Sequence, residues 1–212
     1  MTGPSVTVID YGSGNLLSVT RALEHCGANV VLSDDPAQIA AAERLVLPGV
    51  GAFADGMAGL SSAGLIEPIR SFAASGRPLM GICLGMQMLA SSSEEFGASE
   101  GLGLIPGHVV AIPARTLDGK PHKIPHIGWA DLILNPGREN DDDAGIVDGE
   151  AVYLVHSYRF EPRAAEHRLA DCIYGGQRIA AAVRDGNIVG FQFHPEKSGK
   201  VGLNILAAFL KR

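Results

Sequence analysis

Hydrophobic residues follow two alternating patterns along the first half of the chain. Short β-branched and aliphatic runs, typical of buried strands, occur at 5–9, 29–32, 44–47 and 79–82. Between them, apolar residues recur every three or four positions, as do Leu16, Val19 and Leu23. This spacing predicts helices over 15–26, 35–42, 54–60, 65–75 and 85–92. The alternation of strand and helix predicts a parallel sheet with right-handed crossovers.

The second half of the chain has a different pattern. Strand-like runs follow one another, joined by glycine turns such as Gly175-Gly176 and Asp185-Gly186; they lie at 109–112, 130–134, 151–155, 167–174, 178–184 and 188–193. A last amphipathic helix is predicted over 201–211, and the acidic segment 135–150 reads as a solvated loop. We therefore expect an α/β fold with a mixed, mostly parallel sheet flanked by helices, and a smaller antiparallel β extension.

Composition and charge narrow the classes of protein. The chain has 212 residues, of which 46% are hydrophobic, and a formal net charge of −6. That charge and the scattered Lys and Arg residues argue against a nucleic-acid partner. No apolar run approaches the roughly 18 residues of a membrane span, so no membrane partner is expected. Three widely spaced cysteines indicate neither a zinc site nor a disulfide framework, and they suit a reducing, cytoplasmic location.

One cysteine stands where a protein places a nucleophile. Cys83 follows the apolar run 79–82, and Gly81 and Gly85 flank it at two residues on either side. This Gly-x-nucleophile-x-Gly pattern is typical of a nucleophile elbow, here with a thiol instead of a hydroxyl. The turn would place the sulfur at the start of the next helix, which favours the reactive thiolate. A buried structural cysteine would not need both glycines.

A base for this nucleophile is found near the end of the chain. His194 ends an apolar run, and Glu196 lies two residues further on, separated from it by Pro195. In an extended chain these two side chains point to the same side, so the carboxylate can orient the imidazole. With the cysteine elbow, this pair predicts a Cys-His-Glu triad.

Two glycine-rich loops follow predicted strands. The segment 47–52 contains Gly49, Val50 and Gly51, whose backbone N–H groups could face a developing oxyanion. The segment 11–15 resembles the start of a dinucleotide fingerprint, but Leu17 stands where the third glycine is needed, so nucleotide binding is not expected there.

These motifs together resemble the class I, or triad, glutamine amidotransferases, through the segments 81–87 and 194–196. Within that family, four further segments resemble the glutaminase subunits of imidazole glycerol phosphate synthases: 10–16, 123–129, 155–158 and 194–198. The likeness covers residues 5–211. Ala130 departs from it, because the family often has Asn after the tryptophan, and the acidic segment 135–150 looks longer than usual.

The resemblance implies a flavodoxin-like α/β fold with one glutamine amidotransferase domain over residues 1–212. It implies hydrolysis of glutamine by Cys83, His194 and Glu196, with no metal or organic cofactor. The oxyanion would be held by backbone groups at Leu84, Val50 and Gly51, with Val50 between two glycines as the position where a peptide could flip. Further contacts to glutamine are implied for Gly51, Gln87, Ser157 and Tyr158.

The resemblance also implies a partner. A separate (β/α)8-barrel cyclase subunit would bind this chain as a heterodimer and receive the ammonia, making imidazole glycerol phosphate and an aminoimidazole carboxamide ribotide in histidine biosynthesis. The candidate residues for the partner-facing rim and its gating are Asn15, His126, Trp129 and Tyr153.

Two alternatives remain open from the sequence. The first is the glutaminase subunit of another amidotransferase, such as the one that serves pyridoxal phosphate synthesis, against which the segments 123–129 and 196–198 argue. The second is a non-catalytic regulatory subunit of the same fold, against which the intact Cys83, His194 and Glu196 argue.

Overall fold

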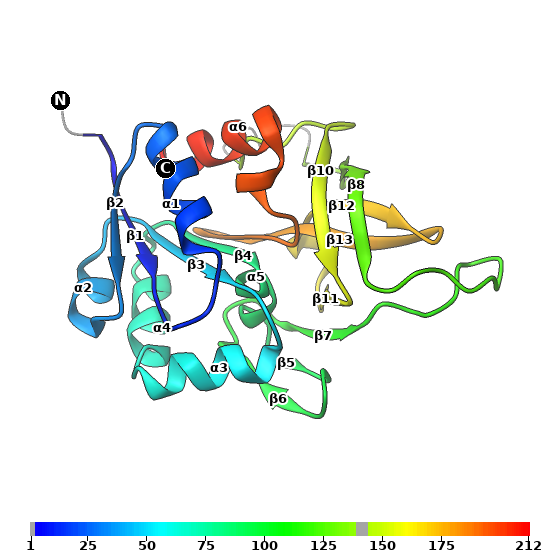
Figure 1. Ribbon diagram of the computed structural model, residues 1–212, viewed down its shortest axis with the longest axis horizontal. Coiled ribbons are helices and arrows are strands. Elements are labelled where there is room, and N and C mark those ends of the chain that lie inside the picture. Colours follow the sequence, from blue (N-terminus) through cyan, green and yellow to red (C-terminus); the bar gives the residue numbers. More distant parts are fainter. Residues whose placement is uncertain (1–2, 139–143) are drawn as a thin grey trace.

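The protein is built around an eight-stranded sheet, seen in the computed structural model (Figure 1), which describes residues 3–138 and 144–212. The strand order is β2-β1-β3-β4-β14-β13-β12-β9. The first five strands in this order run parallel: β2 (Asn29–Ser33), β1 (Ser5–Ile9), β3 (Leu45–Gly49), β4 (Leu79–Cys83) and β14 (Ile188–Phe191). This is the doubly wound order whose ligand site lies at the carboxyl ends of the strands.

The remaining three strands extend the sheet with antiparallel pairing; they are β13 (Gln177–Asp185), β12 (Arg168–Tyr174) and β9 (Ile133–Leu134). Two smaller sheets lie beside them. One pairs β10 (Ala151–His156) with β8 (His126–Asp131), and the other contains β11 (Tyr158–Pro162), β7 (Gly107–Ala111), β5 (Ser92–Ser93) and β6 (Ser99–Glu100).

The helices cover both faces of the parallel strands because successive side chains of a strand point to opposite faces. On β3, Val46 joins the core under α1 (Leu16–His25) and α6 (Gly199–Phe209). Leu45 and Leu47 join the core on the other face, under α2 (Pro36–Ala41), α3 (Phe53–Ser62), α4 (Ile66–Ala74) and α5 (Leu84–Met88). Two short 3-10 helices, η2 (Ala165–His167) and η3 (Pro195–Lys197), complete the described elements.

The predicted α/β fold is confirmed, and most predicted elements lie within a few residues of their observed bounds. The helix expected over 85–92 is wrong at its end, because it stops at Met88. The carbonyls of Met88, Leu89 and Ala90 accept hydrogen bonds from residues 102–105, so the helix cannot continue. The strand expected at 130–134 starts earlier, at His126, and is interrupted at Leu132, while β11 was not predicted.

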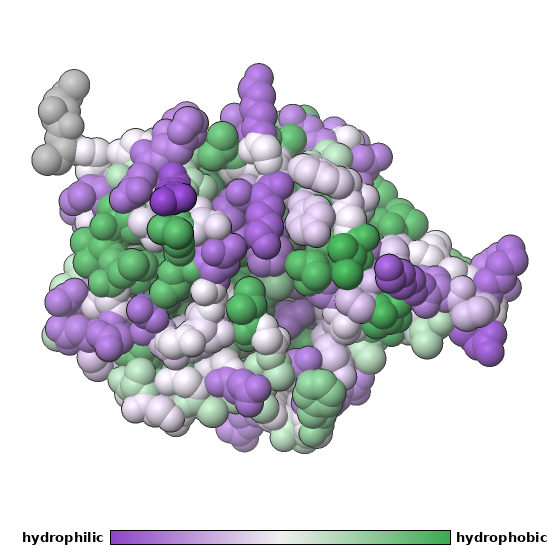
Figure 2. All heavy atoms as spheres, in the orientation of Figure 1, coloured by the Kyte–Doolittle hydropathy of each residue, from purple (hydrophilic) through white to green (hydrophobic). Residues whose placement is uncertain are grey.

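The chain between β7 and β8 projects from the rest of the protein as an arm, at the right of Figure 1. This arm is largely hydrophilic in Figure 2. Of the predicted acidic loop 135–150, residues 139–143 lie outside the described residues. Within the part of the chain that the structure describes, no helix combines the length and apolarity needed to span a membrane.

Candidate active site

Cys83 occupies a strained turn between β4 and α5. Its φ of 55° and ψ of −111° lie in a region that side-chain-bearing residues rarely adopt. The two flanking glycines allow this turn. A Cβ atom on Gly81 would lie 2.8 Å from the backbone of Gly85, and one on Gly85 would overlap the carbonyl oxygen of Leu47. The elbow geometry predicted from the sequence is therefore present in the fold.

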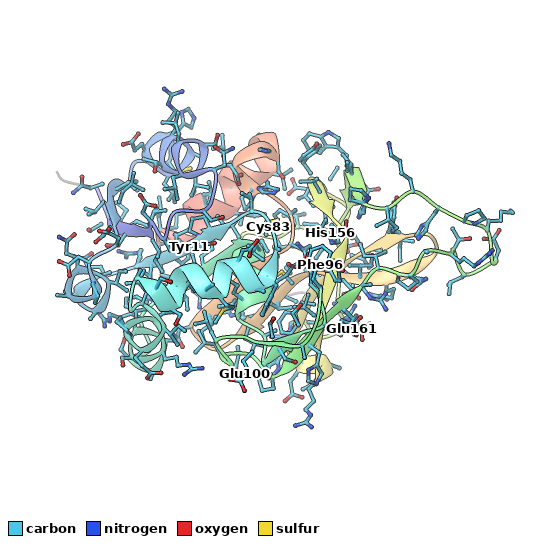
Figure 3. The ribbon with its side chains drawn as sticks, turned by 60° about the horizontal axis from the view of Figure 1, so that its bottom comes forward. Tyr11, Cys83, Phe96, Glu100, His156 and Glu161 are labelled. Atoms are coloured by element: carbon cyan, nitrogen blue, oxygen red, sulfur yellow. The ribbon has the colours of Figure 1, made fainter. Side chains whose placement is uncertain are left out.

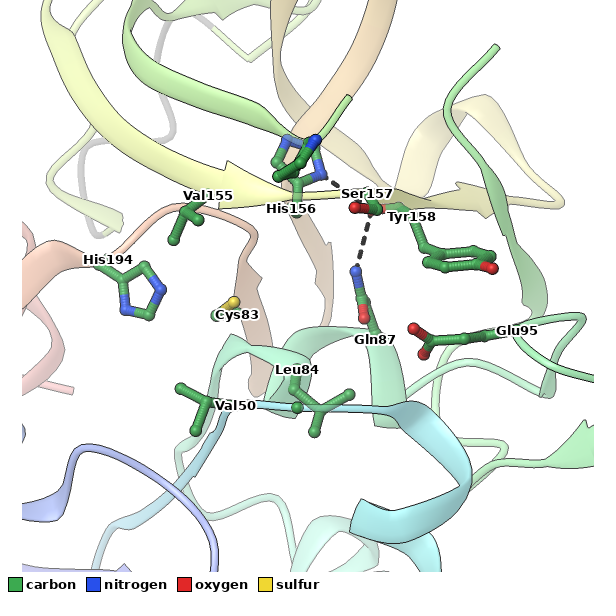
Figure 4. Close-up of a pocket in the computed structure, with 12 residues that line it drawn as sticks. Val50, Cys83, Leu84, Gln87, Glu95, Val155, His156, Ser157, Tyr158 and His194 are labelled. Atoms are coloured by element: carbon green, nitrogen blue, oxygen red, sulfur yellow. Dashed lines mark hydrogen bonds between the residues drawn. The ribbon is translucent and has the colours of Figure 1, made fainter. Parts of the chain in front are cut away.

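The Cys83 thiol opens into a pocket with a volume of about 310 Å³ (Figure 4). In the view of Figure 3, Cys83 lies near the middle of the molecule, between Tyr11 and His156. The pocket contains many of the residues singled out from the sequence; its lining includes Val50, Gly51, Cys83, Leu84, Gln87, Ser157, Tyr158 and His194. A pocket of this size is at the lower end of those that bind small molecules.

His194 and Glu196 form the expected pair at one end of this pocket. The Nδ1 of His194 lies 2.8 Å from the Oε1 of Glu196, and both side chains are at least 96% buried. Burial alone lowers the pKa of His194, but hydrogen bonds to Cys83 and Glu196 and their charges outweigh it and raise the pKa to about 9. His194 can therefore hold a proton between the sulfur and the carboxylate at neutral pH.

The backbone of His194 is held against β10. Its N–H donates to the carbonyl oxygen of Tyr153 at 3.0 Å. The hydroxyl of Ser198 donates to the carbonyl of His194 at 2.7 Å and accepts from the N–H of Tyr153 at 3.0 Å. The strand that carries Tyr153 thus fixes the position of the imidazole.

The candidate oxyanion segment after β3 is held by the loop after β1. The Ser13 hydroxyl donates to the carbonyl of Val50 at 2.7 Å, and the Tyr11 hydroxyl donates to the carbonyl of Pro48 at 3.0 Å. Burial raises the pKa of Tyr11 to about 12, so this hydroxyl keeps its proton. The Val50 carbonyl points toward Ser13. In a trans peptide the N–H is antiparallel to the carbonyl, so the N–H of Gly51 points away from Ser13. Gly51 has a φ of 98°, which a glycine adopts without strain.

Gln87 lies across the pocket from His194 (Figure 4). Its Nε2 donates to the carbonyl oxygen of Tyr158 at 3.0 Å. The same carbonyl accepts from the Nδ1 of His156 at 2.8 Å. These bonds fix the amide of Gln87 beside Ser157 and Tyr158 in the lining of the pocket.

Two buried residues at this site, Glu95 and Gln192, were not predicted from the sequence. Glu95 lines the pocket, and its Oε2 accepts from the N–H of Phe53 at 2.7 Å. Gln192 lies behind the pocket, fully buried, with its amide 2.9 Å from that of Gln87 and 4.0 Å from the sulfur of Cys83. Gln192 could have been noticed as a polar residue inside the apolar run 191–193, whereas no sequence signal distinguishes Glu95 from other acidic residues.

The four candidate interface residues are not equivalent in the fold. Trp129 is 58% exposed, and its ring meets that of Tyr153 edge to face at 5.9 Å. Asn15 is half-buried at the start of α1 and makes no capping hydrogen bond through its side chain. His126 is only 3% exposed, so its placement on the outer rim is corrected: it stacks on Tyr174 and lies 3.2 Å from His156. The alternation along β8 turns its side chain inward while it leaves Trp129 exposed.

The described residues, 3–138 and 144–212, contain no group of three or more His, Cys, Asp or Glu side chains that could hold a metal ion. The chemistry that this pocket offers is that of a buried thiol with an imidazole and a carboxylate beside it, and backbone N–H groups nearby.

The chain is similar to known proteins over nearly its whole length. Residues 7–212 match the family described as glutamine amidotransferase class-I. The chain is 53% identical over 98% of its length to a Legionella pneumophila (strain Lens) protein named imidazole glycerol phosphate synthase subunit HisH 1, of which 99% is covered. It is 47% identical over 96% of its length to the subunit HisH of Syntrophotalea carbinolica, of which 98% is covered.

Solved structures agree on the fold. A structure titled PurLQS from Thermotoga maritima superposes with a TM-score of 0.72 at 23% identity, covering 99% of this chain and 98% of that one. A crystal structure titled glutamine amidotransferase has the same TM-score at 19% identity, with 97% of each chain covered. The family match over residues 7–212 and the full-length relatives lead to one conclusion: this chain belongs to the class-I glutamine amidotransferases.

Proposed function

We propose that this chain is the glutaminase subunit of an imidazole glycerol phosphate synthase. It hydrolyses glutamine to glutamate and ammonia, and the ammonia serves a cyclase subunit in histidine biosynthesis. The observation that carries this proposal is the identity of about half of all positions with proteins named as that subunit, over nearly the full length of both chains. The pocket around Cys83 supports the chemistry.

In the first half of the reaction, the Cys83 thiolate attacks the carboxamide carbon of glutamine. The proton of the thiol resides on His194, whose raised pKa favours the charged imidazolium beside the sulfur. The N–H of Leu84, which directly follows the nucleophile, and an N–H of the Val50–Gly51 segment stabilise the oxyanion of the tetrahedral intermediate. His194 then gives its proton to the leaving nitrogen, so that ammonia departs and a thioester remains on Cys83.

In the second half, His194 takes a proton from water, and the resulting hydroxide attacks the thioester carbon. The carbon–sulfur bond breaks, the electron pair returns to Cys83, and glutamate is released. Glu196 holds the imidazole in one orientation through its bond to Nδ1, which leaves Nε2 for the reaction. One water is consumed for each glutamine.

The opposite end of the pocket offers groups for the amino-acid end of glutamine. Glu95 is 9% exposed and lines the pocket, and its carboxylate suits an ammonium group. Gln87, Ser157, Tyr158 and Gly51 supply amide, hydroxyl and backbone groups around the rest of the ligand. A substrate bound between these groups and Cys83 would have its carboxamide at the sulfur.

The partner is proposed to be a separate (β/α)8-barrel cyclase subunit that forms a heterodimer with this chain. The names of the relatives, each called a subunit, support a second chain. Asn15, Trp129 and Tyr153 are the proposed contacts, and His126 supports Tyr174 and His156 from beneath the surface. A single domain over 1–212 and a cytoplasmic location complete the proposal; the family match over 7–212 and the three free thiols support them.

The test is glutamate release from glutamine by the purified chain, measured alone, with the cyclase subunit, and with that subunit and its nucleotide substrate. We expect strong stimulation by the complete mixture and its loss in Cys83→Ala, with Cys83→Ser as the near-isosteric control. Activity that is indifferent to the cyclase subunit would keep the glutaminase but contradict the pathway. No release under any condition would favour a non-catalytic subunit.

A further inference from the structure

Gln192 is a buried amide that the mechanism above does not use. It follows β14, two residues before His194, and is inaccessible to solvent. Its side chain lies between those of Gln87 and Cys83. Its Oε1 is 2.9 Å from the Nε2 of Gln87, and its Nε2 is 4.0 Å from the sulfur of Cys83. Sulfur is a large atom and accepts longer hydrogen bonds than oxygen does. Gln192 does not line the pocket, so any effect it has on the reaction must pass through these neighbours.

The hydrogen bonds around Gln87 determine which way both amides face. A carbonyl oxygen can only accept, so the atom of Gln87 that lies 3.0 Å from the carbonyl of Tyr158 must be its NH2 nitrogen. That same nitrogen contacts Gln192, so the atom of Gln192 that faces it must be the oxygen. The NH2 group of Gln192 is therefore left facing Cys83.

The end of this network is itself fixed. The carbonyl of Tyr158 accepts a second bond from the Nδ1 of His156, and the Nε2 of His156 is 3.2 Å from the Nδ1 of His126. The pKa of His156 is lowered to about 4, chiefly by burial, so this ring stays neutral at neutral pH. With its Nδ1 donating and its Nε2 accepting, His156 has one tautomer in this network. Neither the side-chain amide of Gln87 nor that of Gln192 can therefore turn over without leaving a buried polar group unpaired.

We propose that Gln192 is a positioning residue that donates an amide N–H to the sulfur of Cys83 and stabilises its thiolate form. This inference rests on the proposed function, because it concerns the nucleophile of that reaction. Cys83 is 8% exposed, and a buried anion needs hydrogen-bond donors in place of water. His194 supplies one donor, and Gln192 supplies another.

The donor acts at the two moments when the sulfur is negative. It stabilises the thiolate before attack on glutamine, and again when the thioester breaks and the electron pair returns to the sulfur. It has a weaker role in the thioester, in which the sulfur is neutral. Loss of Gln192 should therefore lower kcat more than it raises KM.

The decisive measurement is the rate of alkylation of Cys83 by iodoacetamide against pH, followed on the Cys83 peptide by mass spectrometry. This readout needs neither glutamine nor the cyclase subunit, and it separates Cys83 from Cys26 and Cys172. The variants are Gln192→Met, which keeps the length of the side chain without its N–H, and Gln192→Glu, which adds a negative charge there. Asn187→Leu is the matched control: its amide donates to the carbonyls of Ala73 and Arg77 and to no sulfur.

We expect the midpoint of the alkylation curve to rise by roughly one pH unit in Gln192→Met, which corresponds to a tenfold lower rate of alkylation below the midpoint. The midpoint should rise further in Gln192→Glu. The Asn187→Leu midpoint should stay at the wild-type value even where its thermal stability falls. A role of Gln192 in packing alone would change stability without moving the midpoint. Unchanged midpoints in both Gln192 variants would overturn the inference.

A second measurement uses the wild-type protein, so it does not depend on the variants folding. The side-chain amide protons of Gln192 should shift in the NMR spectrum with the same pH midpoint as alkylation, and they should move when Cys83 is alkylated. Amide signals of Gln192 that shift neither with pH nor on alkylation of Cys83 would contradict the contact. If wild-type protein shows these effects but releases no glutamate, the proposed function fails while the contact stands; if it is an active glutaminase without them, only the inference fails.

Discussion

At the scale of single residues, the elbow depends on Gly85, whose Cα lies against the neighbouring strand β3. A Cβ atom there would overlap the carbonyl oxygen of Leu47, and backbone cannot move away as a side-chain tip can. We expect Gly85→Ala to lower the free energy of unfolding by about 3 kcal/mol, the upper end of the usual cost of overpacking, and to abolish glutaminase activity. Chemical denaturation and glutamate release would measure both effects.

Gly56→Ala in α3 is the matched control for that change. Its Cβ would meet the flexible end of Met88 at 2.8 Å, and alanine is favoured over glycine in a helix by about 1 kcal/mol. A net change near zero is expected, with activity retained. Equal losses in both variants would mean that any added methyl group near α5 is harmful, rather than one at the elbow.

The proton on His194 predicts the alkaline side of the activity profile. Its pKa is raised to about 9, so the imidazolium proposed to protonate the leaving nitrogen is present below that pH and is lost as the pH rises through it. We expect kcat/KM to fall with a midpoint near pH 9 in wild type. Glu196→Gln should shift this limb to lower pH, because it removes a neighbouring charge that favours the protonated ring. If Glu196→Gln does not move this alkaline limb, the limb belongs to a group other than His194.

At the scale of elements, the loop after β1 holds the segment after β3. The hydroxyl of Ser13 binds the carbonyl of Val50, so rotation of the Val50–Gly51 peptide must first break this bond. If that rotation completes the oxyanion site, Ser13→Ala should raise glutamate release in the absence of a partner by about 2- to 10-fold, the equivalent of one modest hydrogen bond. Ser13→Thr keeps the hydroxyl and should behave as wild type. A basal rate that stays level or falls in Ser13→Ala would show that the bond does not restrain activity.

At the scale of the whole molecule, the exposed Trp129 lies at a surface formed by β8 and β10, while β10 also anchors His194. A partner that binds this surface therefore contacts strands tied to His194, the proposed catalytic base. We expect Trp129→Ala to weaken binding of the cyclase subunit by about 30-fold, corresponding to roughly 2 kcal/mol for a buried aromatic anchor. Titration calorimetry would measure it.

Leu32→Ala is the control for that surface, since Leu32 is 48% exposed on β2, an edge strand of the large sheet that lies far from β8 and β10 (Figure 1). It should leave the affinity unchanged. If Trp129→Ala alters neither the affinity nor the stimulation of glutamate release, the proposed docking surface is wrong.

The parts of this protein that are local in sequence could be read from the sequence. Gly81, Cys83 and Gly85 specify the elbow through spacings of two residues, and His194 and Glu196 meet because they are also two residues apart. The order of the first strands and helices follows from periods of two and 3.6 residues, which reflect the geometry of each element alone. No such local pattern marked β11 or the early end of α5, because pairing with distant segments decided them.

Contacts between distant residues were decided only by the tertiary structure. Gln192 meets Cys83 across 109 positions of sequence, and Ser13 meets Val50 across 37. Whether His126 is buried and Trp129 exposed depends on which face of β8 packs against Tyr174. The class of fold and the candidate reactive groups could be predicted from the sequence alone, since both depend on residue type and short spacing. The tertiary structure decided which donors surround the thiol, because long-range packing alone brings those side chains within a hydrogen bond of it.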